Sequence, residues 1–332
     1  MRPQRFKTRI TELLGIRHPI LVGGLGPKVS DGRFVASVVN AGGMGFIVAA
    51  GFPDPTEFRD QLQQCRDLTR GQPFGVNLYI SRQAGGVDRV MRQIDILVEE
   101  GVRCVETAGA SPEPIVPLLK QAGVKVLHKV PAVRYALSAS KLGVDAVIVV
   151  GNDCGGHPGI YGIGSIVQAA HAAQVIPLPV VIGGGIGTGS QLSAVLAMGA
   201  DAVLMGTRML VTEELWIHPN AKQLVVRGDG TESVVVKKSI RDHHRVFRNE
   251  SAEAALALDD AQVTEFEAYR PHVMGALSHQ AYVSGDTRRG MLDYGPAAVF
   301  ADAIESAETI FDQLIDGACA ASRRLNSLEH AA

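Results

Sequence analysis

Two glycine-rich segments late in the chain have the composition of a phosphate-binding site. The first is IGGGIGTGSQL at 182–192 and the second is LMGTRML at 204–210. Glycines such as Gly184 and Gly185 let a backbone approach a ligand closely, and backbone N–H groups next to a helix N-terminus bind anions. Met205, Gly206 and Thr207 repeat the arrangement one segment later. We interpret the two segments together as a phosphate grip; the alternative is that their glycines only form turns.

A lysine and a histidine stand out in segments that are otherwise apolar or glycine-rich. Lys129 ends the run KVLHKV, where a buried ammonium group is costly unless it is paired or faces a ligand. It fits either a cation that stabilises the anionic pyrimidine end of a reduced flavin or a Schiff-base lysine. His157 lies in GNDCGGHPG at 151–159, beside Gly156, and its imidazole can exchange a proton near pH 7. We interpret His157 as catalytic; the alternative is a histidine that only holds its loop.

Other polar groups carry weaker signals. GGLG places Gly24, Leu25 and Gly26 at a possible close approach to a cofactor, or in a tight turn. Asn77 lies in the run GVNLYI, where its amide can bind the edge of a planar heterocycle or cap a strand. Cys154 near His157 is a possible nucleophile, but no third group that would orient the pair is evident. Cys154 and His157 as metal ligands would need further partners such as His128, and we expect no metal. For His243 and His244, within a charged run, the default reading is a solvated or lid helix.

Repeating elements must position these residues. Eight short apolar runs recur, with little alternation of apolar and polar residues, as in parallel strands that are buried on both faces. They are 19–24, 43–50, 74–80, 102–110, 125–130, 146–151, 179–185 and 202–207. Helical spacing falls between them, for example over 54–69, 86–100, 112–122, 131–142 and 189–198. Eight strand–helix units predict an α/β fold of the (β/α)8 TIM barrel type rather than an open doubly wound sheet. GIGTGS also differs from the G-x-G-x-x-G pattern of a Rossmann fold.

The rhythm stops after residue 208. We therefore expect a phosphate-binding (β/α)8 barrel over 1–208 and an inserted helical and loop region on the substrate side over 209–295. Residues 296–332 are expected to close on the barrel, with one amphipathic helix over 296–325. The smaller C-terminal domain is thus predicted to be mostly helical and to cover the barrel mouth.

The composition of the chain argues against nucleic acid and membrane partners for this protein. The 332 residues carry a net charge of −2, with 46% hydrophobic and 20% charged residues, and no basic stripe that would indicate nucleic acid. Four scattered cysteines and a start without an apolar signal core favour a reducing cytoplasm. Residues 154–200 contain no Asp, Glu, Lys or Arg, but Gly and Pro interrupt them too often for a membrane helix. We expect that stretch to be buried barrel wall, and we expect no membrane partner.

Taken together, these motifs resemble the nitronate monooxygenase family, formerly the 2-nitropropane dioxygenases. The resemblance covers nearly the whole chain and is carried by HPI-x-x-GG, NAGGMG, PFGVNL, HKV-x-AVR, CGGHPG, GGGI and MGTR, with SIRDHHRVFRN and SGDTRRG in the C-terminal part. It implies a barrel with non-covalently bound FMN and His157 as the catalytic residue. The residues implied to surround the flavin are Gly24, Leu25, Gly26, Asn77, Lys129, Gly156, Gly184, Gly185, Met205, Gly206 and Thr207.

The family framework supports several activities on small molecules. We expect oxidation of alkyl nitronates with O2, and the resemblance is close to the NADH:quinone reductase branch, with NAD(P)H as co-substrate. An FMN-dependent enoyl-thioester reductase and a non-enzymatic barrel that binds a phosphorylated metabolite are further alternatives. A homodimer is a possible assembly. Leu25-Gly26 and the residues after Asn77 depart from the family pattern near the expected flavin.

Overall fold

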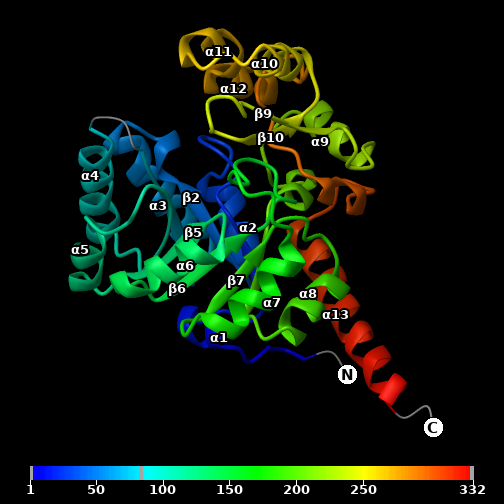
Figure 1. The fold of residues 1–332 in the computed structure, drawn as a ribbon. Helices are drawn as coiled ribbons and strands as arrows, with labels where there is room; N and C mark the ends of the chain where they lie inside the picture. Colours follow the sequence, from blue (N-terminus) through cyan, green and yellow to red (C-terminus); the bar gives the residue numbers. More distant parts are fainter. Residues whose placement is uncertain (1–2, 82–84, 330–332) are drawn as a thin grey trace.

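A closed barrel of eight parallel strands forms the body of the protein in the computed structural model, which describes residues 3–81 and 85–329 (Figure 1). The expected TIM barrel is confirmed, and an open doubly wound sheet is excluded, because β1 pairs with both β2 and β8. The strands are β1 (Ile20–Val22), β2 (Met44–Val48), β3 (Gly75–Ile80), β4 (Cys104–Gly109), β5 (Lys125–Val130), β6 (Ala146–Val150), β7 (Val180–Gly183) and β8 (Ala202–Met205).

Helices follow the strands around the outside of the barrel. They are α2 (Gly32–Asn40), α3 (Pro55–Leu68), α4 (Gly86–Glu99), α5 (Val116–Gln121), α6 (Val133–Ala139), α7 (Ser165–Val175) and α8 (Gly189–Ala197), with short 3-10 turns η1 (Ala49–Gly51), η2 (Ser140–Leu142) and η3 (Thr207–Val211). Before β1, α1 (Arg9–Leu14) lies at the opposite end of the barrel from the helices of residues 250–284 (Figure 1). Its Ile10 and Leu14 pack with the barrel interior and close that end.

Both faces of the strands are buried, which explains why the strand sequences do not alternate. Leu21, Phe46 and Ile148 belong to the inner cluster of the barrel. Val22 and Ile47, one residue further along β1 or β2, belong to the outer cluster between strands and helices. A strand residue at the inner face near the carboxyl end therefore points into the barrel mouth, where TIM barrels place their active sites.

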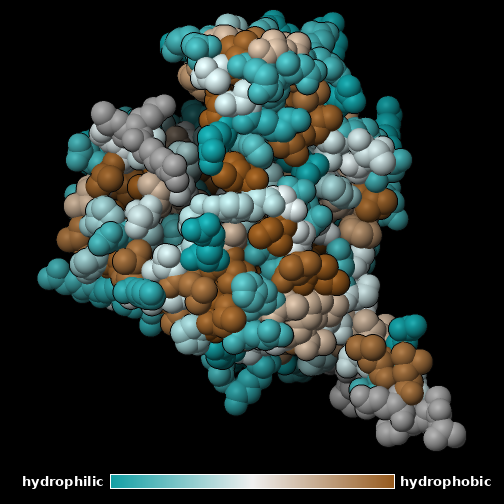
Figure 2. Space-filling model, in the orientation of Figure 1, coloured by the Kyte–Doolittle hydropathy of each residue, from teal (hydrophilic) through white to brown (hydrophobic). Residues whose placement is uncertain are grey.

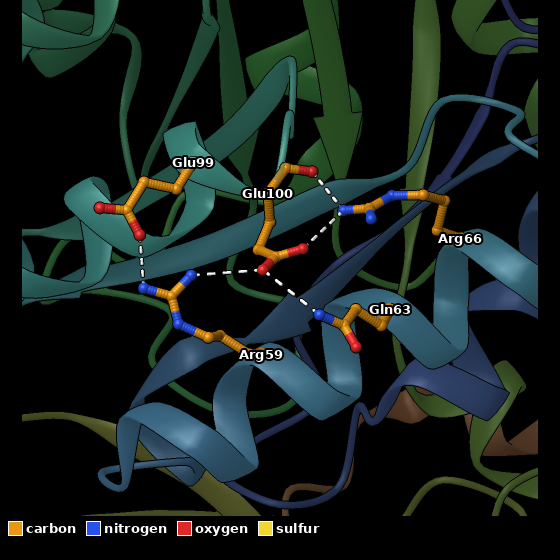
Figure 3. A network of polar contacts seen from close by, with 5 residues as sticks. All are labelled: Arg59, Gln63, Arg66, Glu99 and Glu100. Atoms are coloured by element: carbon orange, nitrogen blue, oxygen red, sulfur yellow. Dashed lines mark hydrogen bonds and ion pairs between the residues drawn. The ribbon is translucent and has the colours of Figure 1, made fainter.

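An ion-pair network fixes α3 against the end of α4 on the side of the barrel (Figure 3). Glu100 accepts hydrogen bonds from Arg59 at 3.2 Å and Arg66 at 3.0 Å, and Gln63 also reaches it. Although burial of Glu100 acts against it, the bonds from Arg66, Arg59 and Gln63 lower the pKa of that carboxyl. Arg59 also pairs with Glu99. The arginines and glutamates of this network pair with one another, so we interpret the network as structural rather than catalytic.

A small C-terminal lobe sits over one end of the barrel (Figure 1). It holds α9 (Pro219–Val226), α10 (Glu250–Asp260), α11 (Phe266–Val273) and α12 (Gly275–Ser284), and its own apolar cluster includes Val236, Val246 and Tyr269. It is mostly helical, as predicted. The lobe also contains a feature that was not predicted, an antiparallel ribbon of β9 (Ser233–Val236) and β10 (His244–Phe247).

The chain returns to the barrel through η4 (Pro296–Phe300) and α13 (Ala307–Glu329). The prediction of one helix over 296–325 was wrong at its start. Residues between η4 and α13 bond to the chain after η3 instead, with Glu305 N–H donating to the Val211 carbonyl at 3.2 Å and Glu213 N–H donating to the Glu305 carbonyl at 2.9 Å. α13 then packs closely on α8, where a Cβ added at Gly189 would lie 2.2 Å from the Leu314 carbonyl oxygen.

The uncharged stretch 154–200 is only partly buried, so the expectation of a buried wall was wrong for its first third. Tyr161, Ile166 and Val167 are 42%, 68% and 59% exposed. They lie in the loop before α7 or on α7 itself, on a face of the barrel where Figure 2 shows several hydrophobic patches below the lobe. Among the described residues, no helix is both long and apolar enough to span a membrane.

Candidate active site

A buried carboxylate organises the polar residues that point into the barrel mouth. Glu106 lies on β4, is fully buried, and sits 2.9 Å from the Lys129 ammonium through its Oε1. Its Oε2 accepts hydrogen bonds from Asn77 Nδ2 at 2.5 Å and Gly24 N–H at 3.3 Å. Three of the predicted residues are therefore brought together by a fourth that was not predicted. Glu106 offsets the charge of Lys129, which is the pairing that a buried lysine was expected to need.

The predicted phosphate loops end neighbouring strands, β7 and β8. Gly184 and Gly185 have positive φ angles of 99° and 71°, a conformation that favours glycine. A Cβ added at Gly206 would meet only Leu25 Cδ2, at 4.0 Å, so open space lies beside it. A glycine loop next to open space fits an anionic group such as a phosphate, because backbone N–H groups bind anions.

The other predicted residues at this edge have structural partners. Thr207 Oγ1 accepts a hydrogen bond from Gly295 N–H at 3.0 Å, which ties the loop after β8 to the lobe. The Met205 side chain belongs to the outer cluster, so only its main chain is near the mouth, where its carbonyl accepts from Gly23 N–H. Leu25 N–H donates to Ser30 Oγ at 3.0 Å, and Gly26 has a φ of 137°. These residues shape the loops more than they present functional groups.

The loop that carries His157 is held from both sides. Asp153 Oδ2 accepts from Ser165 N–H at 2.7 Å at the start of α7, which fixes the end of the loop to the barrel. On the other side, Gly156 and Arg245 of β10 exchange two backbone hydrogen bonds of 2.9 and 2.7 Å. The lobe ribbon therefore extends onto the active-site loop and sets the position of His157.

A second histidine lies directly against the predicted catalytic one. The rings of His157 and His244 are stacked, with centroids 4.2 Å apart and planes inclined by 17°. His244 is 8% exposed, and its Nε2 lies 2.6 Å from Asp293 Oδ1. The default reading of His244 as part of a solvated or lid helix was wrong. It lies on a strand, it is buried, and it backs His157 with an imidazole–carboxylate pair.

Neighbouring charges favour the neutral form of His157. Desolvation among the packed loops and the positive groups of His244 and Lys237 lower the pKa of His157, and Asp242 and Asp293 offset this only in part. The His157 side chain keeps 57% of its surface exposed, with its Nε2 3.6 Å from Asp242 Oδ1. A neutral, accessible imidazole is able to accept a proton from a bound molecule.

The alternatives built on Cys154 and His128 are not supported. Burial raises the pKa of the Cys154 thiol to about 12, so it stays protonated and is a poor nucleophile. His128 points away from Lys129 and lies 2.9 Å from Thr107 Oγ1. No group of three His, Cys, Asp or Glu side chains that could hold a metal ion occurs within residues 3–81 and 85–329.

Glu106 and the His244–Asp293 pair were missed from the sequence. A signal existed for Glu106, because a charged residue in the apolar run VRCVETAGA is as unusual as Lys129 in its own run. No comparable signal marks Asp293, which lies 49 residues after His244 and forms an isolated bridge with Val246.

Fold and site together define a (β/α)8 barrel whose mouth brings together two glycine loops, the buried Asn77–Glu106–Lys129 cluster and the exposed His157. The sequence model of the nitronate monooxygenase family matches residues 7–317, and the chain belongs to this family of oxidoreductases.

Individual relatives differ in their named activities. The chain is 35% identical over 244 residues to (3aS,4S,5R,7aS)-5-hydroxy-7a-methyl-1-oxo-octahydro-1H-indene-4-carboxyl-CoA dehydrogenase of Rhodococcus jostii (strain RHA1), a match spanning 74% of this chain but 66%, just under two thirds, of that protein. It is 27% identical over 270 residues to a "Probable nitronate monooxygenase" of Staphylococcus aureus (strain JH9), spanning 70% of this chain and 75% of that protein. FabK from Thermotoga maritima has a similar structure, with a TM-score of 0.88, 28% identity, and coverage of 97% of this chain and 99% of that one.

Proposed function

We propose that the protein is an FMN-dependent oxidoreductase of the nitronate monooxygenase type. The observation that carries the proposal is the arrangement of the mouth. The glycine loops with Gly184, Gly185 and Gly206 end the neighbouring strands β7 and β8, the Asn77–Glu106–Lys129 cluster is buried in the same mouth, and His157 lies on the loop after β6. Bound there, FMN would supply the electron-accepting centre that the side chains of the chain lack.

The residues of the chain would divide the remaining work. Loop amides would bind the phosphate, and Asn77 and Lys129 would hydrogen-bond the polar edge of the ring system. His157 would accept the proton of a neutral nitroalkane, or donate a hydrogen bond to a nitronate that is already an anion. The stacked His244 and its partner Asp293 would keep the His157 ring in place while it does so.

A second candidate is oxidation or reduction of an acyl-coenzyme A thioester. Two observations favour it over quinone reduction. The dehydrogenase relative acts on a carboxyl-CoA according to its name. Two exposed arginines also lie near His157: Arg241 precedes Asp242, whose carboxylate is 3.6 Å from His157, and Arg134 bonds to Tyr161 of the His157 loop. The proton acceptor would be the same, because the carbon next to a thioester is also acidic.

The test begins with the cofactor. The purified protein should be yellow, and FMN should be released on heating and identified by chromatography; a protein that stays colourless after incubation with FMN refutes the proposal. The flavin is then mixed anaerobically with alkyl nitronate, NADH, NADPH or a saturated acyl-CoA. Bleaching by nitronate supports the first candidate, and bleaching by acyl-CoA supports the second. Bleaching by NADH or NADPH alone, followed by reoxidation with quinone, would make the quinone reductase the correct assignment, whereas NADPH bleaching followed by reoxidation with an enoyl thioester would indicate an enoyl reductase.

A further inference from the structure

A cluster of cations and tyrosines lies on the rim of the mouth, outside the Asn77–Glu106–Lys129 cluster. Arg134, in the first turn of α6, places its guanidinium carbon 5.6 Å from the Tyr135 ring centroid and 5.7 Å from that of Tyr161. Its Nη1 donates to the Tyr161 hydroxyl at 3.2 Å, and the two phenolic oxygens are 3.2 Å apart. The hydrogen bond with Tyr135 and the charges of Arg134 and of Arg241, in the turn between β9 and β10, lower the pKa of the Tyr161 phenol.

The positive charge of this cluster is not neutralised by the protein. Among the residues that the structure describes, neither Arg134 nor Arg241 has a carboxylate within ion-pair distance, and neither has the neighbouring Lys238. The nearby acids are engaged elsewhere: Asp242 with Lys237, and Asp153 with the first amide of α7. Uncompensated arginines next to hydroxyl donors are typical of phosphate recognition.

Two members of the cluster, Tyr161 and Arg241, lie on segments that also contact His157 or contain it: the β6–α7 loop and the β9–β10 turn. Tyr161 belongs to the same β6–α7 loop, which Asn152 N–H closes on the Ile163 carbonyl at 2.8 Å. Arg241 directly precedes Asp242, whose carboxylate is 3.6 Å from His157. A ligand that reacts at His157 and extends outward would therefore pass over these side chains.

The aromatic part of the cluster narrows the class of ligand. Tyr135 and Tyr161 are 40% and 42% exposed, and Ile163 beside them is 37% exposed, so an apolar platform adjoins the cations. Phosphate beside a flat apolar surface suits a nucleotide, which joins a planar base to phosphates.

We propose that Arg134, Tyr161 and Arg241 form a subsite for the phosphates of a nucleotide whose other end reaches His157. The nucleotide would be the coenzyme A part of a thioester or a nicotinamide dinucleotide, which share this chemistry. The inference rests on the proposed function for its location at an active-site mouth, but its test does not need turnover.

The experiment measures binding by calorimetry to the protein as purified. The probes are coenzyme A, NADH, NADPH and pantetheine, which lacks the nucleotide phosphates of coenzyme A. Variants are Arg134→Gln and Arg241→Gln, and Arg92→Gln on α4 is the matched control, because Arg92 is equally exposed but lies on another face. A charge-assisted phosphate contact predicts that each rim variant raises Kd about 10-fold for the ligand that uses the subsite. Pantetheine binding and the control should be unchanged.

The outcomes distinguish coenzyme A from a nicotinamide coenzyme as the ligand, and they include results that would overturn the proposal. Weakening of coenzyme A alone assigns the subsite to an acyl carrier, and weakening of NADH or NADPH alone assigns it to the nicotinamide coenzyme. If wild-type protein binds none of the three nucleotides, or if both rim variants bind them as tightly as the control, the proposal is overturned. It is also overturned if the rim variants change only self-association in sedimentation, which would make the cluster a subunit contact. A protein that binds nucleotide through the arginines but lacks flavin would refute the proposed function and leave the subsite standing.

Discussion

The two charged residues beside His157, Asp242 and Lys237, should affect the pKa of its imidazole in opposite directions. Asp242 Oδ1 lies 3.6 Å from His157 Nε2, and the other oxygen of Asp242 is 2.5 Å from Lys237 Nζ. The carboxylate favours the imidazolium form and the ammonium disfavours it. Asp242→Asn should therefore lower the pKa of His157 further, and Lys237→Gln should raise it, both by removing the ammonium and by freeing Asp242 to act on the ring.

The magnitude follows from the geometry. Two unit charges 3.6 Å apart in a medium as polarisable as water interact by about 1 kcal/mol, or about 0.8 of a pKa unit. His157 and Asp242 are both at least half exposed, so salt reduces this further. We expect shifts of about half a unit in each direction at low ionic strength, and smaller shifts in 0.5 M salt.

Proton NMR of the imidazole C2 protons measures these shifts without any substrate. The chain has 10 histidines, and the signal of His157 is the one that His157→Gln removes. In kinetics, the rate rises with pH as a catalytic base loses its proton, so the acid limb of kcat/KM should move to lower pH in Asp242→Asn and to higher pH in Lys237→Gln. Glu267→Gln, which breaks an exposed ion pair with Arg270 on α11, is the matched control and should move neither. Shifts of the same sign in both variants would refute the reasoning.

Three more predictions address other parts of the site. His157→Ala should retain FMN and the melting temperature but reduce turnover of a neutral nitroalkane about 10²–10⁴-fold, and that of a pre-formed nitronate less, as measured by oxygen uptake; loss of FMN would indicate a loop-holding role instead. Glu106→Leu should lower the free energy of unfolding by about 3 kcal/mol in denaturant titrations, because Lys129 and Asn77 lose their buried acceptor, and Lys129→Met should recover part of that loss in the double variant; additive losses would show that the two residues are not coupled. Burial lowers the pKa of His128 from 6.5 to about 4, so the unfolded chain binds more protons than the folded chain between these pH values, and the free energy of unfolding falls as the pH drops from 6.5 to 4. His128→Gln should therefore remove about 2 kcal/mol of the difference in the free energy of unfolding between pH 7 and pH 4.5. Equal pH dependence in the variant and the wild type would contradict this.

Features that depend on local pattern were predictable from the sequence. The runs at 125–130 and 146–151 correspond to β5 and β6 almost residue for residue, because buried parallel strands are apolar throughout. Lys129 and Asn77 attracted notice as polar residues within such runs, and both do point into the mouth beside Glu106. A polar group that interrupts a barrel strand is informative because its burial needs a partner.

Features that depend on long-range pairing were not predictable. The apolar spacing at 296–325 favours one helix, yet Glu305 is drawn into hydrogen bonds with Val211 and Glu213, nearly a hundred residues earlier. β9 and β10 are only four residues each, and neither SVVV nor HRVF has the clear alternation of polar and apolar residues that would predict a strand pair. In both places tertiary hydrogen bonds outweigh local preference, and a single sequence does not reveal them.

The lobe supplies more than a cover for the barrel. On β10, His244 stacks on His157 and Arg245 pairs with the backbone of Gly156. In the segment 293–295, Asp293 bonds to His244 and Gly295 N–H donates to Thr207. The groups suited to a cofactor thus lie on barrel strands, whereas the groups that set the charge and surroundings of His157 come from the lobe. A change of substrate would then require changes mainly in the β9–β10 turn and around Asp293, with the Asn77–Glu106–Lys129 cluster left intact. This division is consistent with one barrel framework serving relatives that bear such different names as dehydrogenase and monooxygenase.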